Sequence, residues 1–324
     1  MNKLATSFAG LELKNPFIVS SSGLTNSPQK NKKWEDAGAA AVVLKSLFEE
    51  EIEAESAQMD NGAHTEEMDY LQFYHRAHRL ETYLELIRET KKICTIPVIA
   101  SINCYRNSDW TTFAKSMEEA GADAIELNIM SVCSELNYEY GSFEQQHLDI
   151  VSQVKKTVNI PVIIKLGSRF TNCVPLAHQL YALGASVVLF NRMTSFDINI
   201  DTQDVASRET LGQQFELPEV LRWTGLVSAR VPQLSLAASG GVADGASMIK
   251  AILAGASAAE VCSALYMNGA EHIQKTLKFV EDWMTKNNYQ SIAQFKGLLN
   301  ATKTGTIDTF ERTQFFKNYS LREE

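Results

Sequence analysis

Short apolar runs recur along the chain and alternate with longer segments of mixed polarity. The runs are continuous, as in Val162-Ile163-Ile164, which is typical of parallel strands buried on both faces. The segments between them space their apolar residues as helices do, and we expect helices over residues 31–37, 109–119, 143–158, 174–183, 244–253 and 271–286. A short hairpin is expected before the first run, over Phe8–Leu13. From Phe17 onward, the pattern predicts eight strand-and-helix units.

Two sequence patterns, one with proline and one with a Gly-Ala pair, mark the predicted strand starts, and they alternate along the chain. Three strands open at a proline or directly after one, at Pro97, Pro161 and Pro232, because the first residue of a strand need not donate to the ladder. Four others follow a Gly-Ala pair that ends a helix, where glycine suits the left-handed closing position; these glycines are Gly38, Gly121, Gly184 and Gly255.

Eight such units predict an α/β fold, a closed (β/α)8 TIM barrel whose active site lies at the C-terminal ends of the strands. An open doubly wound sheet is the alternative, but no Gly-x-Gly-x-x-Gly turn follows the first strand. We expect one domain over residues 1–324. A long insertion over 48–78, after the second strand, would lie on the C-terminal face of the barrel, with Tyr70–His78 as a lid or a subunit contact.

Charge and composition narrow the range of partners. A net charge of -9 disfavours nucleic acid, because neutralising phosphates requires clustered Lys and Arg. The first ten residues lack the features of a signal peptide, and no apolar run approaches the roughly 18 residues that span a bilayer. The five cysteines are never spaced Cys-x-x-Cys, which disfavours disulfides and zinc. We expect a cytoplasmic protein with a small-molecule substrate, no membrane partner and no metal.

Every predicted strand ends in a polar residue or a glycine. These strand-end residues are Ser22 and Gly23, Lys45 and Ser46, Asn103, Asn128, Lys165, Asn191, Gly240 and Gly241, and Cys262 and Ser263. Each one alone is equally well explained as a turn former or a polar cap. In a barrel they would meet at one mouth and could bind a polar ligand. The last four, which follow the seventh and eighth strands, have the form of a phosphate cradle.

Lys165 ends a run of apolar residues, so its ammonium group would enter a largely apolar mouth. Two functional interpretations compete: a fixed charge that stabilises an anion, or an amine of lowered pKa that forms a Schiff base. The structural alternative is a salt bridge inside the barrel.

Short motifs at the strand ends carry a resemblance to a known family. They are Lys45-Ser46, Glu126-Leu127-Asn128, Ile164-Lys165-Leu166, Phe190-Asn191, Ser239-Gly240-Gly241 and Ser263-Ala264-Leu265. Together they resemble the dihydroorotate dehydrogenase family of FMN-containing barrels, and the similarity runs from about Leu11 to Leu299.

The resemblance implies an FMN-dependent dehydrogenase acting on CH–CH bonds in pyrimidine biosynthesis, and a homodimer. It implies that the FMN phosphate is bound by Gly240, Gly241, Cys262 and Ser263. It implies that the flavin ring is held by Ser22, Gly23, Lys45, Ser46, Asn103, Asn128 and Lys165, with Lys165 favouring the reduced, anionic flavin. Dihydroorotate or a related cyclic substrate would contact Lys45, Asn128 and Asn191. A loop base would remove a proton while a hydride passes to the flavin.

The loop after the fourth strand departs from the family pattern Asn-x-Ser-Cys-Pro-Asn, and its Pro-Asn pair is absent. Position assigns the base to Ser131, whereas chemistry favours Cys133, because a thiol with a pKa of about 8.5 ionises more readily than a hydroxyl. In a third interpretation neither residue acts and the loop only packs. The loop after the sixth strand departs as well: Arg192 could bind a substrate carboxylate, or pair with Asp197 at the surface.

Two other functions therefore stand beside the flavin dehydrogenase. One is a lyase or aldolase that uses Lys165 as a Schiff base on a phosphorylated substrate. The other is a flavin-binding protein whose loop lacks a functional base.

Overall fold

The structure is a computed structural model, and it describes residues 2–48, 65–103, 110–129, 134, 136–193, 196–207, 211–212, 214–302 and 308–311. Eight parallel strands close into a barrel, and the ring returns from its last strand to its first. The order is β3 (Phe17–Val19), β4 (Ala41–Val43), β6 (Val98–Asn103), β7 (Ala124–Ile129), β8 (Val162–Gly167), β9 (Ser186–Asn191), β12 (Leu236–Ser239) and β13 (Ala258–Val261). A short strand, β5 (Leu47–Phe48), adds to β6. The predicted (β/α)8 barrel is confirmed.

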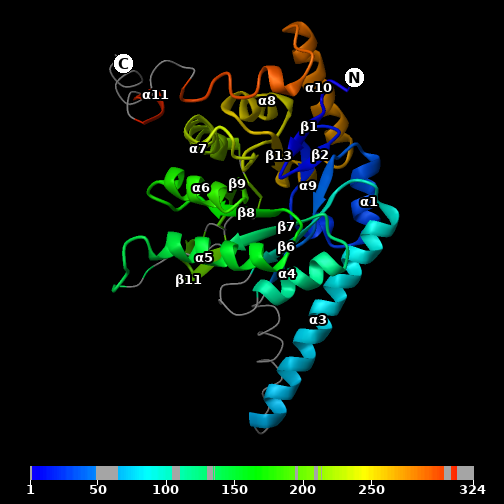
Figure 1. The fold of residues 1–324 in the computed structure, drawn as a ribbon, viewed down its shortest axis with the longest axis vertical. Coiled ribbons are helices and arrows are strands. Elements are labelled where there is room, and N and C mark those ends of the chain that lie inside the picture. The colour runs from blue at the N-terminus through cyan, green and yellow to red at the C-terminus, as the bar shows by residue number, and fades with distance from the viewer. Residues whose placement is uncertain are drawn as a thin grey trace.

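Helices surround the strands, with α1 and α3 on one side of the view in Figure 1 and α5 to α8 on the other. They are α1 (Pro28–Asp36), α3 (Thr65–Ile93), α4 (Trp110–Glu119), α5 (Ser142–Thr157), α6 (Cys173–Ala182), α7 (Leu217–Arg230), α8 (Gly245–Ala254) and α10 (Glu271–Lys286). The six helices expected from the sequence begin and end within three residues of these bounds. Among the described residues, no helix is both long and apolar enough to cross a membrane.

The expected insertion over 48–78 is described only in part. Residues 49–64 lie outside the described residues, and from Thr65 the backbone is already helical, as the start of the 29-residue α3. The side chains of residues 65–77 also lie outside the description, so the assignment of Tyr70–His78 as a lid or subunit contact stays a prediction.

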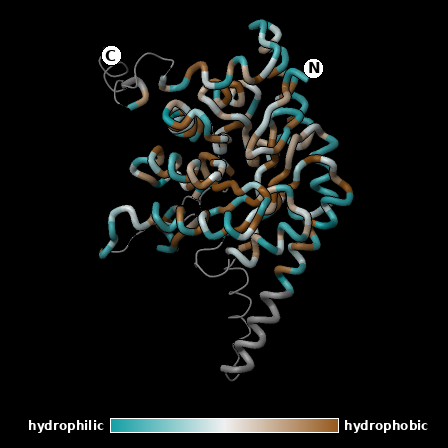
Figure 2. Tube along the Cα trace, in the orientation of Figure 1, coloured by the Kyte–Doolittle hydropathy of each residue, from teal (hydrophilic) through white to brown (hydrophobic). Residues whose placement is uncertain are grey.

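The interior of the barrel is apolar at its N-terminal end. The hairpin of β1 (Thr6–Phe8) and β2 (Leu11–Leu13), expected from the sequence, covers this end, where Phe8 packs against Ile18, Ile99 and Ile163. A larger apolar cluster lies between the outer faces of the strands and the helices. Figure 2 shows the same division, with hydrophobic segments gathered at the strands and hydrophilic ones along the outer helices. This packing fixes which strand residues face inward.

Some local predictions were wrong. β12 begins four residues after Pro232, at Leu236, because the chain first turns, with the Leu234 N–H donating to Val231 O. β3 and β13 end before the serine, glycine and cysteine positions assigned to their ends: Ser22 is the N-cap of the short helix η1 (Gly23–Thr25), and Cys262 is the N-cap of α9 (Ser263–Asn268).

The remaining elements lie outside the regular repeat. An antiparallel hairpin that the sequence interpretation did not include, β10 (Phe196–Asn199) with β11 (Asp204–Ser207), follows β9. The short helix η2 (Gln214–Glu216) precedes α7, and η3 (Ile292–Gln294) and α11 (Asp308–Glu311) follow α10.

Candidate active site

A layer of polar side chains lies inside the barrel. Its members are two residues closer to the C-terminal ends of the strands than the apolar side chains of the interior. Side chains two residues apart on a strand share a face, so each member follows an inward-facing apolar residue of the same strand. The members are Ser20, Ser101, Glu126, Lys165, Ser239 and Glu260, and all six are buried. The inward residues that precede them are Ile18, Ile99, Ala124, Ile163, Ala237 and Ala258.

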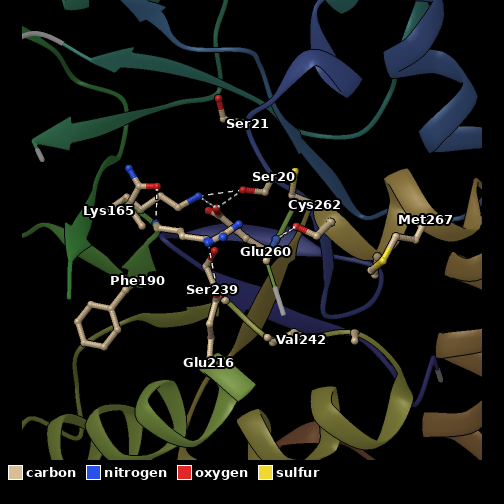
Figure 3. Close-up of a pocket in the computed structure, with 18 of the residues that line it drawn as sticks. Ser20, Ser21, Lys165, Phe190, Glu216, Ser239, Val242, Glu260, Cys262 and Met267 are labelled. Atoms are coloured by element: carbon tan, nitrogen blue, oxygen red, sulfur yellow. Dashed lines mark hydrogen bonds and ion pairs between the residues drawn. The ribbon is translucent and has the colours of Figure 1, made fainter. Parts of the chain in front are cut away.

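Lys165, on β8, is held by groups from strands that are not its neighbours, Ser20 after β3 and Glu260 on β13, and it lies near Glu126 on the adjacent β7. Its Nζ is 2.6 Å from Glu260 Oε2, 2.8 Å from Ser20 Oγ and 3.8 Å from Glu126 Oε1. Figure 3 shows Lys165, Ser20 and Glu260 pointing toward one another. Burial by itself would lower the pKa of Lys165, but the acidic side chains beside it, Glu126 and above all the hydrogen-bonded Glu260, outweigh burial and raise that pKa above its ordinary value. Lys165 is therefore a protonated, paired cation.

The two carboxyl groups of the layer differ in protonation. Burial and the charge of Glu260 raise the pKa of Glu126 well above its ordinary value. Burial also opposes ionisation of Glu260, but the adjacent Lys165 ammonium outweighs it and lowers the pKa of Glu260. Both Glu126 oxygens and Glu260 Oε1 are buried, and no N–H or hydroxyl group in the described part of the chain donates a hydrogen bond to them. A neutral Glu126 carboxyl that donates to Glu260 gives one oxygen of each carboxyl a partner and leaves Glu126, Lys165 and Glu260 together with no net charge.

Inspection of the strand ends alone missed both glutamates. Glu126 lies two residues before Asn128, and Glu260 lies two residues before Cys262, so the period of two was the signal that could have found them. Ser20 likewise lies two residues before Ser22. Its hydroxyl accepts a hydrogen bond from Lys165 and donates one to Glu260.

The segment after β12 forms a cradle of free amides. In the described part of the chain, the N–H groups of Gly240 and Gly241 have no hydrogen-bond partner. Gly241 has a φ of +69°, and a Cβ built on it would lie 2.4 Å from the backbone nitrogen of Leu217. Only glycine fits there, because a side chain would meet both an unfavourable backbone conformation and a fixed backbone atom.

A cavity of about 630 Å³ joins the polar layer to this cradle. Its lining includes six of the expected site residues, which are Lys165, Asn191, Gly240, Gly241, Cys262 and Ser263. Ser20, Glu216 and Arg192 line it as well. Residues from β8, β9, β12 and β13 thus meet at one site, as the strand ends predicted.

Lys45 and Ser46 line a neighbouring cavity of about 220 Å³ instead, together with Arg79 and Tyr83. The two cavities are linked by hydroxyl groups, since Ser46 Oγ lies 3.1 Å from Ser21 Oγ, which faces the larger cavity. Ser46 Oγ also lies 2.8 Å from Ser101 Oγ of the polar layer.

The expected amide residues behave differently from one another. Asn191 Nδ2 donates to Asn128 Oδ1 over 2.5 Å, so these two side chains form a pair at the ends of β9 and β7. Asn103 ends β6 beside Phe48 and does not line the larger cavity.

The residues expected at the ends of the first and last strands lie close together. Ser22 contacts Cys262, and burial raises the pKa of that thiol despite the contact. A Cβ on Gly23 would lie 2.9 Å from the Tyr266 hydroxyl.

Ser131 and Cys133, the two candidates for the base, lie outside the described residues. The strand end that leads to them is well anchored: the His147 ring nitrogens lie 3.2 Å from Ile129 O and 2.7 Å from Phe143 O. Phe143 and Phe170 pack against the same ring. Ile129, the last residue of β7, is therefore anchored to α5.

Comparison with known proteins agrees with the resemblance found in the sequence. A family model described as dihydroorotate dehydrogenase matches residues 3–284. The chain belongs to this family. Members of the dihydroorotate dehydrogenase family share the barrel observed here, and the match covers all eight of its strands.

Three relatives indicate the range of named activities. The catalytic subunit of dihydroorotate dehydrogenase B (NAD(+)) from Thermoplasma volcanium is 27% identical over 92% of this chain and 99% of that protein. Dihydroorotate dehydrogenase A (fumarate) from Limosilactobacillus reuteri is 26% identical over 82% of this chain and 88% of that protein. The chloroplastic dihydropyrimidine dehydrogenase (NADP(+)) from Arabidopsis thaliana is 22% identical over 91% of this chain and 76% of that protein.

The residues present fit FMN, the cofactor implied by the resemblance to the dihydroorotate dehydrogenase family. The unpartnered amides of Gly240 and Gly241 can donate to phosphate oxygens, and glycine at both positions keeps that approach open. The cavity volume lies in the range of roughly 300–1,000 Å³ that small-molecule sites occupy. Lys165 supplies a fixed positive charge in the lining of the same cavity.

Proposed function

We propose that this protein is an FMN-dependent dehydrogenase that oxidises dihydroorotate, or a related cyclic substrate, at a CH–CH bond. The observation that carries the proposal is one cavity lined both by Gly240 and Gly241, whose amides are free in the described part of the chain, and by the paired cation Lys165. Membership of the dihydroorotate dehydrogenase family supports the reaction class.

Each part of the site has a chemical role in this proposal. FMN, when bound, would supply the group that accepts a hydride from the substrate. Gly240, Gly241 and Ser263 would hold its phosphate, and Lys165 would place a positive charge beside its ring. Lys165 can keep that charge because Glu260 holds it in place, 2.6 Å away.

The side chains of Asn128 and Asn191 would orient the substrate. They now satisfy each other with one hydrogen bond. Each amide retains further donor and acceptor capacity, which suits the ring N–H and C=O groups of a cyclic imide or amide. A base on the loop after β7, Ser131 or Cys133, would remove the substrate proton.

The test is an anaerobic titration of the purified full-length protein. We expect flavin absorbance in the purified protein or after addition of FMN, and bleaching of that absorbance by dihydroorotate or by another cyclic imide. Protein that takes up no FMN would contradict the proposed function. A flavin that no such substrate bleaches would instead favour the flavin-binding protein without a loop base.

The same titration identifies the base. Ser131→Ala and Cys133→Ala should be compared in single-turnover reduction, each with FMN affinity measured as a control for folding. The residue that acts as the base is the one whose loss slows reduction by about 10²–10⁴-fold with FMN affinity unchanged. Equal, small effects of both substitutions would exclude both residues.

The Schiff-base alternative does not match the state of Lys165. An amine must be neutral to attack a carbonyl, whereas Lys165 donates to Glu260 and Ser20, and its pKa is raised. We expect borohydride treatment in the presence of phosphorylated aldehydes and ketones to leave Lys165 unmodified, as checked by peptide mass spectrometry.

We further propose that the protein is a cytoplasmic homodimer, on the basis of the family resemblance. Light scattering coupled to size-exclusion chromatography should give a mass near twice the 36.0 kDa of the chain. A mass of one chain at micromolar concentration would contradict the dimer without affecting the proposed chemistry.

A further inference from the structure

An ion pair lies beside the cradle in the described structure. Arg192 Nε is 2.9 Å from Glu216 Oε1, and both side chains are about a fifth to a quarter exposed, at 24% and 21%. Arg192 directly follows β9, and Glu216 ends η2. Both residues line the large cavity, and Figure 3 labels Glu216 among the residues around it.

The surroundings of two glycines locate this pair. A Cβ built on Gly212 would lie 3.1 Å from Glu216 Oε2, 3.3 Å from Ser263 Oγ and 3.8 Å from Arg192 Cδ. A Cβ built on Gly240 would lie 3.8 Å from the same Glu216 oxygen. The Glu216 carboxylate therefore lies beside Gly240, and the stem of Arg192 lies at Gly212, as the Ser263 hydroxyl does, so the pair borders the phosphate cradle.

Charge decides what this pair can do when a phosphate arrives. A phosphate placed at Gly240 would be repelled by the Glu216 carboxylate, while the guanidinium beside it would attract the phosphate strongly. A phosphate offers a guanidinium two parallel hydrogen bonds and a larger charge than a carboxylate does. A partly exposed ion pair contributes little stability, so exchanging its anion costs little.

We infer that Arg192 is the cationic element of the phosphate site and that Glu216 holds it there until a phosphate takes the carboxylate's place. The inference rests on the proposed function and extends it to the choice of cofactor. With Arg192 added to the amides of Gly240 and Gly241, the chain selects FMN over riboflavin, which carries no phosphate. The role assigns Arg192 to the cofactor, rather than to a substrate carboxylate or to the surface.

The experiment measures the affinity of flavin-free, full-length protein for FMN and for riboflavin by the quenching of flavin fluorescence. The variants are Arg192→Gln and Glu216→Gln. Arg222→Gln and Glu219→Gln serve as matched controls, because these residues form a similar exposed pair on α7, 3.9 Å apart, and do not line the cavity.

Arg192→Gln should weaken FMN binding by about 10- to 100-fold, the usual range for a charged hydrogen-bond partner, and change riboflavin binding by no more than about twofold. Glu216→Gln should tighten FMN binding several-fold and leave riboflavin binding unchanged. Both control variants should bind both flavins as the wild type does.

Two results would overturn the inference while leaving the proposed function intact. Equal weakening of FMN and riboflavin by Arg192→Gln would mean that the arginine shapes the cavity and does not bind phosphate. Weakening of FMN by Glu216→Gln would mean that Glu216 positions Arg192 and does not compete with the phosphate. A wild-type protein that binds neither flavin would contradict the proposed function, and the inference with it.

Discussion

Replacement of Glu126 by Gln should stabilise the protein when Glu260 is present and destabilise it when Glu260 is absent. In the wild type, Glu260 neutralises Lys165, and Glu126 is a second, buried carboxyl that remains protonated. Gln reproduces the donor of that protonated group without the possibility of ionisation. When Glu260 is replaced by Gln, Glu126 is the remaining carboxyl group near Lys165. It then ionises and serves as the counter-charge of Lys165, so its loss destabilises the protein.

Distances give the size of these effects. At an effective dielectric constant of about 20, the attraction between unit charges is about 6 kcal/mol at the 2.6 Å that separates Lys165 from Glu260, and about 4 kcal/mol at the 3.8 Å to Glu126. Glu260→Gln should therefore cost about 2 kcal/mol, with Glu126 taking over as counter-charge. The double variant leaves Lys165 buried without a carboxylate, which costs about 3–5 kcal/mol.

The effect of Glu126→Gln in the wild-type background should grow with pH. A raised carboxyl pKa means that the folded state keeps a proton that the unfolded state releases above pH of about 4.3. The free energy of unfolding of the wild type therefore falls as the pH rises from about 4.3 toward the raised pKa of Glu126 in the folded state. Glu126→Gln removes that loss of stability. The variant should match the wild type near pH 4.5 and be the more stable protein at pH 8.

Urea unfolding of the four proteins, followed by tryptophan fluorescence at pH 4.5 and pH 8, measures these differences. Glu119→Gln, an exposed carboxyl on α4, is the control and should change stability by less than about 0.5 kcal/mol. Additive effects of the two substitutions, within about 0.5 kcal/mol, would refute the view that Glu126 is a reserve counter-charge. So would a wild type that becomes more stable than Glu126→Gln as the pH rises.

Three further substitutions test other parts of the molecule. Gly241→Ala should weaken FMN binding and lower the free energy of unfolding in urea by about 1–3 kcal/mol, because the new Cβ would meet the Leu217 backbone. Gly10→Ala is the control: Gly10 also has a positive φ, but a Cβ there would have no atom within 4 Å, and FMN affinity should not change. Burial lowers the pKa of His147, so the wild type should lose stability as pH falls below about 6.5, and His147→Leu should flatten that loss in acid titrations. Phe8→Ala should cost about 3–5 kcal/mol by calorimetry or urea, without a change in FMN affinity.

The barrel could be predicted because its signals are local and repeated. Continuous apolar runs, such as the one before Lys165, identify strands buried on both faces, and the glycines that close four helices have the positive φ expected of them. Pro232 misled the prediction because a proline also fits the turn that precedes a strand. The β10–β11 hairpin was missed, although Phe196-Asp197-Ile198-Asn199 alternates in polarity as an exposed strand does.

The site was predicted less completely, because a strand end is only one layer of a barrel. Lys165, Asn191 and the Gly240–Gly241 pair were found where the sequence suggested, at one cavity. Lys45 was expected at the same site but lines the adjacent cavity. Glu216 could not be anticipated, because it belongs to no strand and reaches the cradle through the path of the chain before α7.

The period of two along each strand also determines how a ligand would be oriented. Because Glu126, Lys165 and Glu260 all face inward one repeat above the apolar interior, the charge of Lys165 is already balanced within the protein before any ligand arrives. Arg192, at the cradle, is paired with a partly exposed carboxylate, which a stronger anion can replace more readily than it can replace the buried Glu260. The most anionic part of a bound molecule is therefore directed to Gly240 and Gly241, and its less charged part to the polar layer. That polarity matches a phosphorylated flavin with its phosphate at the cradle and its ring beside Lys165.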